Sequence, residues 1–256
     1  MSRERDRALH GDKSLLRVLA GLQLVVFDVD GTLYDQTALR HRMLLLLARH
    51  LLLSVRGWRT LRVIRAFRRT REKLANEEAP AVGEMQYRAV ASQLKVLPDE
   101  VACVANEWLG RRPLPLLSRH REPGVADLFQ ALRARHIPIA VLSDYPAMDK
   151  LRALGLDADV VVTATDRDVD RFKPSTVGLQ RILQRTGVAP ADCLVIGDRE
   201  DRDGECARRL GARFLLKVRH PPRASGEFRD YAELTRALTA GLQAQPSVPT
   251  GDGMTA

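Results

Sequence analysis

The sequence predicts an α/β protein: a Rossmann-like, doubly wound parallel sheet core into which an all-helical cap domain is inserted. Two observations lead to this fold class. Short apolar runs alternate with helical patterns over most of the chain, whereas one long segment near the start holds helical patterns only. Continuous apolar runs are typical of strands that a parallel sheet buries on both faces. Five such runs are present: 22–30, 137–144, 159–165, 193–198 and 213–218.

Helical patterns separate the later runs. Residues 123–134 begin with Pro-Gly and then repeat apolar side chains at helical spacing. Glycine follows each of three further stretches, as is common where a helix ends. These stretches are 147–154, 174–186 and 203–210. The alternation of strand and helix indicates a parallel sheet.

The segment after the first run has no strand pattern. It holds four helix-like stretches, at 38–55, 58–76, 84–96 and 99–109. We therefore expect a helical cap at 36–115, and a core made of 21–35 and 116–242. Residues 114–123 would be the hinge that returns the chain to the core. Residues 1–20 form an N-terminal extension, and the polar tail at 243–256 is expected to be disordered.

Composition narrows the class of protein. The 256 residues suffice for one large domain or for a core with an inserted cap. The net charge of +9 favours anionic partners such as phosphorylated metabolites, nucleic acid or acidic lipid headgroups. The three cysteines form no C-x-x-C pair and no disulfide framework, which indicates a cytoplasmic protein. Each apolar stretch is shorter than the ~20 residues that a membrane-spanning helix needs.

Two carboxylates end the first apolar run, in the sequence Asp28-Val-Asp30-Gly31-Thr32-Leu33. Side chains two residues apart on a strand point the same way. The Gly-Thr turn that follows can direct backbone N–H groups at an anion. The pair suits a metal-assisted nucleophile with a neighbouring acid/base, although two Asp residues also commonly open a simple turn.

Three other predicted strands end in polar residues. Ser143 follows the second run, Lys173 precedes a proline after the third, and an acidic turn follows the fourth, with Asp198 at its start and Asp203 near its end. Ligands of doubly wound sheets bind beyond the carboxyl ends of the strands. We therefore expect these residues and the Asp28–Asp30 pair to share one site.

The set fits phosphoryl transfer. Asp28 would attack phosphorus, while Asp30 would protonate the leaving oxygen and then activate the water that hydrolyses the aspartyl-phosphate. Mg²⁺ needs hard oxygen ligands, which Asp28, Asp198 and the backbone carbonyl of Asp30 can supply. Lys173, Ser143 and local N–H groups, together with the Thr32 hydroxyl, would bind the phosphate oxygens.

This ordered set resembles the four motifs of the haloacid dehalogenase superfamily, which match Asp28–Leu33, Ser143, Lys173 with its proline, and the acidic turn from residue 197 to 203. The resemblance implies a Mg²⁺-dependent enzyme with a helical cap of the class inserted after the first motif. Dehalogenase-type relatives lack the acid/base at Asp30, so a phosphatase is implied first and a phosphomutase second.

Two positions depart from or extend the pattern. Asp144 stands where many relatives carry Asn, which leaves the hydrogen bonding after Ser143 open. Both Asp201 and Asp203 are available as the second acid of the last motif. The spacing from Asp198 favours Asp203, which would act mostly through metal-bound water.

Arginines recur about every third residue over residues 56–71, beside an apolar stripe that includes Trp58 and Phe67. On a helix the arginines would form one solvated face, the simpler interpretation. The alternative is contact with an anionic partner, such as an acidic membrane surface. Few aromatic residues accompany the arginines, so nucleic acid is not expected as the partner.

The sequence thus predicts a Mg²⁺-dependent phosphomonoester hydrolase that acts on a small phosphorylated metabolite. A phosphomutase is the near alternative, because it would form the same aspartyl-phosphate. A non-catalytic binding or regulatory protein that uses the arginine-rich helix is the alternative from another class. The identity of the substrate and the oligomeric state stay open.

Overall fold

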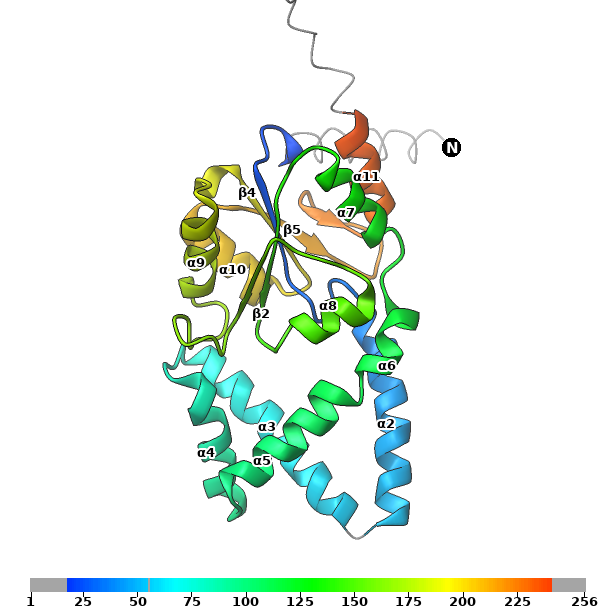
Figure 1. Ribbon diagram of the computed structural model, residues 1–256, viewed down its shortest axis with the longest axis vertical. Coiled ribbons are helices and arrows are strands. Elements are labelled where there is room, and N and C mark those ends of the chain that lie inside the picture. Colours follow the sequence, from blue (N-terminus) through cyan, green and yellow to red (C-terminus); the bar gives the residue numbers. More distant parts are fainter. Residues whose placement is uncertain (1–17, 55, 241–256) are drawn as a thin grey trace, which may run out of the picture.

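The computed structural model describes residues 18–54 and 56–240 (Figure 1). Within these residues one parallel sheet has six strands in the spatial order β3-β2-β1-β4-β5-β6. The doubly wound α/β fold is therefore confirmed. Sequence patterns did not predict β6, which has only two residues. The strands are β1 (Leu24–Phe27), β2 (Ile139–Ser143), β3 (Val160–Thr163), β4 (Cys193–Gly197), β5 (Arg213–Lys217) and β6 (Glu227–Phe228).

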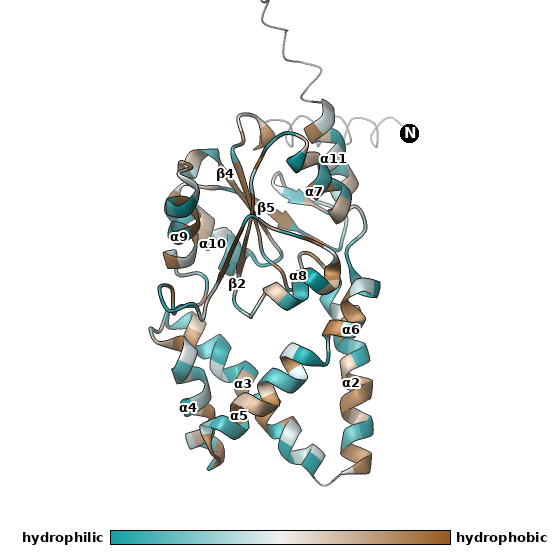
Figure 2. Ribbon diagram, in the orientation of Figure 1, coloured by the Kyte–Doolittle hydropathy of each residue, from teal (hydrophilic) through white to brown (hydrophobic). Residues whose placement is uncertain are grey.

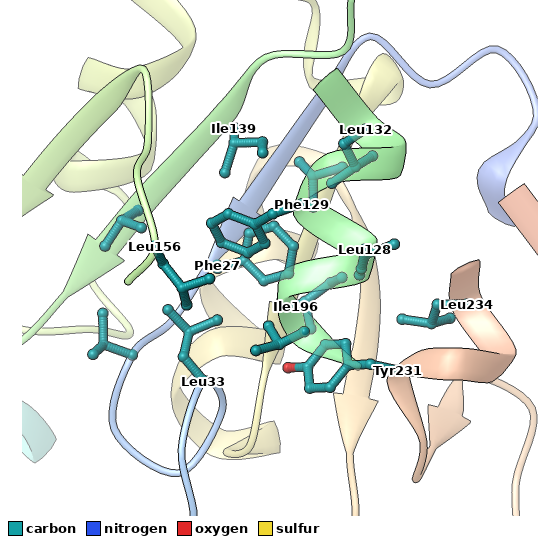
Figure 3. Packing of buried hydrophobic residues seen from close by; sticks show 14 of the residues in the cluster. Phe27, Leu33, Leu128, Phe129, Leu132, Ile139, Leu156, Ile196, Tyr231 and Leu234 are labelled. Atoms are coloured by element: carbon teal, nitrogen blue, oxygen red, sulfur yellow. The ribbon is translucent and has the colours of Figure 1, made fainter. Parts of the chain in front are cut away.

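Helices cover both faces of the sheet, which explains why the strands are continuously apolar. Val25 and Phe27 of β1 pack toward one face, where Phe27 and Phe129 lie with ring centroids 4.8 Å apart (Figure 3). Leu24 and Val26 pack toward the other. The first face is covered by α7 (Val125–Arg133), α8 (Met148–Leu154) and α11 (Tyr231–Ala240), and the second by α9 (Val177–Thr186) and α10 (Glu205–Leu210).

Four helices and a π-helical turn follow β1 and lie beyond the carboxyl ends of the strands (Figure 1). Asp35 begins the first of them, because its carboxylate accepts hydrogen bonds from the N–H groups of Thr37 at 2.9 Å and Ala38 at 3.0 Å. The elements are α2 (Gln36–Leu53), α3 (Arg56–Asn76), α4 (Val82–Leu94), α5 (Pro98–Ala105) and η1 (Asn106–Arg111).

The helices beyond the sheet have hydrophobic clusters of their own. Val63 and Phe67 of α3 pack with Val90 of α4 and Val101 of α5. A second cluster joins α2, α3 and η1. Apolar residues occur on several sides of α2 (Figure 2), so that some of its leucines pack inward while others are exposed to solvent.

The chain returns to the core through short helical turns. The predicted hinge at 114–123 includes α6 (Leu114–Leu117) and the 3-10 turn η2 (Ser118–His120). Leu117 is completely buried, so part of this connection packs into the main core. Two further short turns complete the described chain, η3 (Pro190–Asp192) and η4 (Glu200–Gly204).

Some predictions fall outside the described residues. The tail at 243–256 and most of the extension at 1–20 belong to them. Among the described helices, none is both long enough and apolar enough to cross a membrane.

Candidate active site

Residues from the ends of β1, β3 and β4 meet at one point. The Lys173 ammonium donates to a carboxylate oxygen of Asp28 and to one of Asp203, each at 2.6 Å, and to the carbonyl of Leu142 at 3.2 Å. Carboxylate oxygens of Asp28, Asp198 and Asp203 lie within 4.8 Å of one another. The structure therefore brings together four of the residues that the sequence singled out.

Two glycines allow the carboxylates to come this close to the backbone. A Cβ on Gly31 would collide with the Asp198 carboxylate, and Gly31 also has a positive φ of 99°. A Cβ on Gly197 would likewise collide with the Asp203 carboxylate. Both glycines are therefore required by packing at the site, and Gly31 is required by turn geometry as well.

Crowding of the carboxylates changes their titration. Burial raises the pKa of Asp28 well above its usual range against the attraction of Lys173, and Asp203 and Asp198 raise it further. Burial, supported by Asp203, raises the pKa of Asp198 to about 6. Burial alone would lower the pKa of Lys173, but Asp203 and Asp28 outweigh it and raise this pKa. A divalent cation would relieve the repulsion, and the hard oxygens of the three Asp residues fit Mg²⁺.

Asp30 lies beside this cluster with partners of its own. Lys150 of α8 donates to both of its carboxylate oxygens, at 2.5 and 2.7 Å, and the Tyr34 hydroxyl donates to one of them. Burial alone would raise the pKa of Asp30, but Lys150 and Tyr34 outweigh it and lower this pKa. The ionised form of Asp30 is thus stabilised, although its side chain is only 14% exposed.

Sequence reasoning missed both partners of Asp30. Lys150 lies at helical spacing from Ala147 and Leu154, which are buried. A lysine in register with an apolar stripe is a signal that its side chain points inward. Tyr34 follows the first motif directly, where no spacing rule distinguishes it.

Ser143 and Thr32 are buried but point to local partners. The Ser143 hydroxyl accepts from the N–H of Tyr145 at 3.2 Å. The Thr32 hydroxyl donates to the Asp28 carboxylate at 3.0 Å and so orients it. Neither residue is among those that line the pocket described below. Their predicted contacts with phosphate stay predictions.

The last motif places its two candidate acids differently. Asp203 is buried, and besides Lys173 it accepts from the N–H of Arg199 at 3.2 Å. Asp201 is exposed and pairs with the Arg199 guanidinium at 2.8 Å. Asp203 is therefore the acid that lies at the cluster. Asp144, the departure from the second motif, accepts from the backbone N–H of Lys173 at 3.0 Å.

A pocket of about 310 Å³ opens between the cluster and the helices beyond the sheet. Its lining includes Asp28, Asp30, Lys173, Asp198 and Asp203 on the side of the core. The other walls come from α2, α3 and η1. These five predicted site residues thus face a cavity that can hold a small molecule.

The arginines of α3 do not share one face. Arg71 is buried, with its guanidinium 3.8 Å from the ring centre of Tyr145 and 4.1 Å from that of Phe172, and it donates to the carbonyl of Asp144 at 2.6 Å. Arg68 lines the pocket, whereas Arg59 pairs with Glu100. Arg71 and Arg68 therefore belong to the site. The remaining four, Arg56, Arg62, Arg65 and Arg69, are exposed.

Helix α3 also contacts the loop that carries the last motif. Glu72 accepts from Arg199 at 2.8 Å and from Arg202 at 3.0 Å. Arg202 is buried and also donates to the Asn76 side chain and, at 3.3 Å, to the carbonyl of Lys173. One acidic side chain thereby links α3 to the turn that holds Asp198 and Asp203.

The fold and the site together define a hydrolase of the α/β class with an acidic, lysine-bearing active centre. The family model for haloacid dehalogenase-like hydrolases matches residues 22–211, about three quarters of the chain. The chain therefore belongs to the haloacid dehalogenase-like (HAD) hydrolase family. No curated protein matches the chain.

Solved structures of HAD proteins share the fold. A magnesium-bound structure of the Bacillus subtilis protein YfnB has a TM-score of 0.63 at 17% identity, over 85% of this chain and 99% of that one. A 2-haloacid dehalogenase from Pseudomonas syringae has a TM-score of 0.59 at 19% identity, over 86% and 99%. A HAD phosphatase from Thermococcus onnurineus has a TM-score of 0.50 at 19% identity, over 85% and 98%. At such low identity these similarities show the fold alone.

Proposed function

We propose that this HAD hydrolase is a Mg²⁺-dependent phosphomonoester hydrolase that forms an aspartyl-phosphate on Asp28. The observation that carries the proposal is the Asp30 carboxylate, which is only 14% exposed and faces the same pocket as Asp28. Dehalogenases and phosphatases both occur among the similar structures, so the choice between them depends on the chemistry of this site.

Asp30 favours an ester substrate because of the leaving group. A halide departs as a stable anion and needs no proton, whereas the alkoxide of a phosphate ester must be protonated. In the first step Asp30 takes up a proton from the monoanionic phosphate of the bound ester. Asp28 then attacks phosphorus, the P–O bond to the alcohol breaks, and Asp30 donates that proton to the leaving oxygen. In the second step water attacks the aspartyl-phosphate, the bond between Asp28 and phosphorus breaks, and Asp30 takes a proton from the water and passes it to the departing phosphate. The cycle returns both carboxylates to their starting state.

The neighbours of Asp30 and Asp28 support these roles. Lys150 stabilises the ionised form of Asp30, which is the form that accepts a proton from water. Thr32 orients the attacking carboxylate of Asp28, and Lys173 is placed to neutralise the charge of the phosphate. Mg²⁺ bound at Asp28 and Asp198, with Asp203 beside it, would supply further charge neutralisation for the phosphate. The helices over the pocket would limit the access of water.

The test is release of inorganic phosphate from a panel of phosphomonoesters in Mg²⁺, with EDTA and Asp28→Asn as blanks. We expect Mg²⁺-dependent turnover in the wild-type protein and none with Asp28→Asn. Asp30→Asn should slow hydrolysis of alkyl esters by about 10²–10⁴-fold, the usual contribution of an acid/base.

Two results would redirect the assignment. Halide release from 2-haloacids without phosphate release from any ester would contradict the proposal. Transfer of phosphate to another position of the substrate, with little free phosphate, would indicate a phosphomutase, which uses the same aspartyl-phosphate.

A further inference from the structure

The pocket changes in character with distance from the catalytic carboxylates. Along α2, Gln36 and Arg40 come first, next to the core, and Met43, Leu44 and Leu47 follow. Figure 1 shows α2 running away from the sheet and α3 returning to it. Leu39 also lines the pocket, between Gln36 and Arg40. The wall that α2 contributes therefore holds polar and apolar residues near the core and only apolar residues farther out.

The lining residues of α3 also change from polar to apolar with distance from the core, although this helix runs toward the core. Ile64 lines the pocket far from the core, whereas Arg68, Arg71 and Glu72 line it closer to the core. Ala75 lines the pocket at the core end of α3 as well. On both helices the polar lining residues all lie toward Asp28, and the outer lining residues are all apolar. The outer lining consists of Met43, Leu44, Leu47, Ile64, Trp108 and Leu109.

These outer residues offer little to a polar ligand. Of their side chains, only the Trp108 indole carries a hydrogen-bond donor, and none carries a strong acceptor. A hydroxyl placed among them would lose hydrogen bonds to water without replacement. Methylene groups would instead leave water for apolar surface.

We propose that the substrate of this site is a phosphomonoester whose alcohol is an unbranched apolar chain, with the phosphate at Asp28 and the chain along α2. The inference rests on the proposed phosphatase function and specifies its substrate class. The apolar side of α2 from Leu39 to Leu47 rises about 12 Å. An extended chain of about nine or ten carbons has this length, from the C–C bond lengths.

The experiment measures phosphate release from a series of n-alkyl phosphates, methyl to dodecyl, with Mg²⁺ and below their micellar concentrations. We expect kcat/KM to rise by up to about fourfold per methylene, from the transfer of one CH₂ out of water, and to level off near ten carbons. The gain should appear mainly in KM, because the chain is remote from the reacting atoms.

A matched pair of variants tests the placement of the chain. Leu44 lines the pocket and is 58% exposed, while Leu45 is 64% exposed and does not line it. Both sites therefore tolerate a charge without loss of the fold, which thermal unfolding verifies. Leu44→Asp should flatten the dependence of log kcat/KM on chain length, and Leu45→Asp should retain the wild-type slope.

The outcomes separate the inference from the function on which it rests. Turnover of small esters with less than a twofold change in kcat/KM between methyl and octyl phosphate would overturn the inference and leave the phosphatase intact. Equal slopes for the two leucine variants would overturn the placement along α2. Binding of alkyl phosphates to Asp28→Asn that tightens with chain length, without wild-type turnover of any ester, would support the inference and refute the function.

Discussion

Replacing Lys173 by methionine removes the cation at the centre of the carboxylate cluster. Lys173 is 5% exposed, and its ammonium group donates to Asp28, Asp203 and the carbonyl of Leu142. Methionine keeps the approximate length of the side chain but leaves these acceptors without a donor. In the absence of metal, repulsion among Asp28, Asp198 and Asp203 is then no longer balanced.

The magnitude follows from the burial of the partners. Removal of one member of a buried ion pair costs about 3–5 kcal/mol of folding free energy, because the remaining charge stays in a poorly solvated place. Both carboxylates that Lys173 contacts are nearly inaccessible, with side chains 9% and 3% exposed. We therefore expect the free energy of unfolding in EDTA at pH 7 to fall by about 3–5 kcal/mol.

Acid should reduce this loss. Burial already raises the pKa of Asp28 and of Asp203 in the wild-type protein, and removing Lys173 raises both further. The folded variant then binds more protons than the unfolded chain at pH values between the raised pKa and the unfolded value of about 4. Its stability relative to wild type therefore rises as the pH falls from 7 to 5. Urea unfolding at both pH values measures the change.

Lys217 offers a matched control. Its side chain is 5% exposed and pairs with Glu122 at 3.0 Å, outside the carboxylate cluster. Mg²⁺ should recover part of the loss in Lys173→Met, since the cation binds the folded cluster, but none of the loss in Lys217→Met. A loss below about 1 kcal/mol for Lys173→Met, or equal recovery in both variants, would refute the electrostatic reasoning.

Three further predictions concern the groups around the cluster. Because the pKa of Asp198 is raised to about 6, we expect the Mg²⁺ dissociation constant to grow about tenfold or more per pH unit below 6. Calorimetry measures this constant, and a value that does not change with pH would contradict the prediction. Lys150→Met should raise the pKa of Asp30, because burial then dominates, and kcat should be lost at a higher pH as the solution is acidified. An acidic limb of the pH–rate profile that does not move would argue against Asp30 as the base. Glu72→Ala should lower the free energy of unfolding in urea by at most about 1 kcal/mol, because Glu72 is half-exposed and Arg202 keeps its other acceptors. A loss above about 2 kcal/mol would show a stronger link between α3 and the core.

Local patterns were sufficient to predict the sheet and the residues at its edge. A buried parallel strand has a recognisable run of apolar residues, and its carboxyl end is the residue at which that run stops. Asp28 and Asp198 could therefore be assigned to one edge from their places in the chain, and Lys173 from its place in the loop that follows the third run. The two-residue strand β6 could not, because it is too short to show a pattern.

Rotation of the helices about their axes was harder to predict. Residues 56–71 were expected to present the arginines on one face, yet Arg71 lies in register with Ile64, Phe67 and Leu74 and is buried with them. A formal charge was taken as a sign of exposure, whereas the aromatic rings of Tyr145 and Phe172 and the carbonyl of Asp144 make a buried guanidinium favourable here.

By itself, the sequence determined the α/β class, the order of the catalytic motifs along the chain and the acidic character of the site, because each depends on periodicity over a few residues. Only the tertiary structure decided that Lys150 contacts Asp30, 120 positions away, and that Asp203 rather than Asp201 lies at the cluster. It also decided that the pocket turns apolar along α2. These features depend on how separate helices pack against one sheet edge, and that packing is set by contacts between residues distant in sequence.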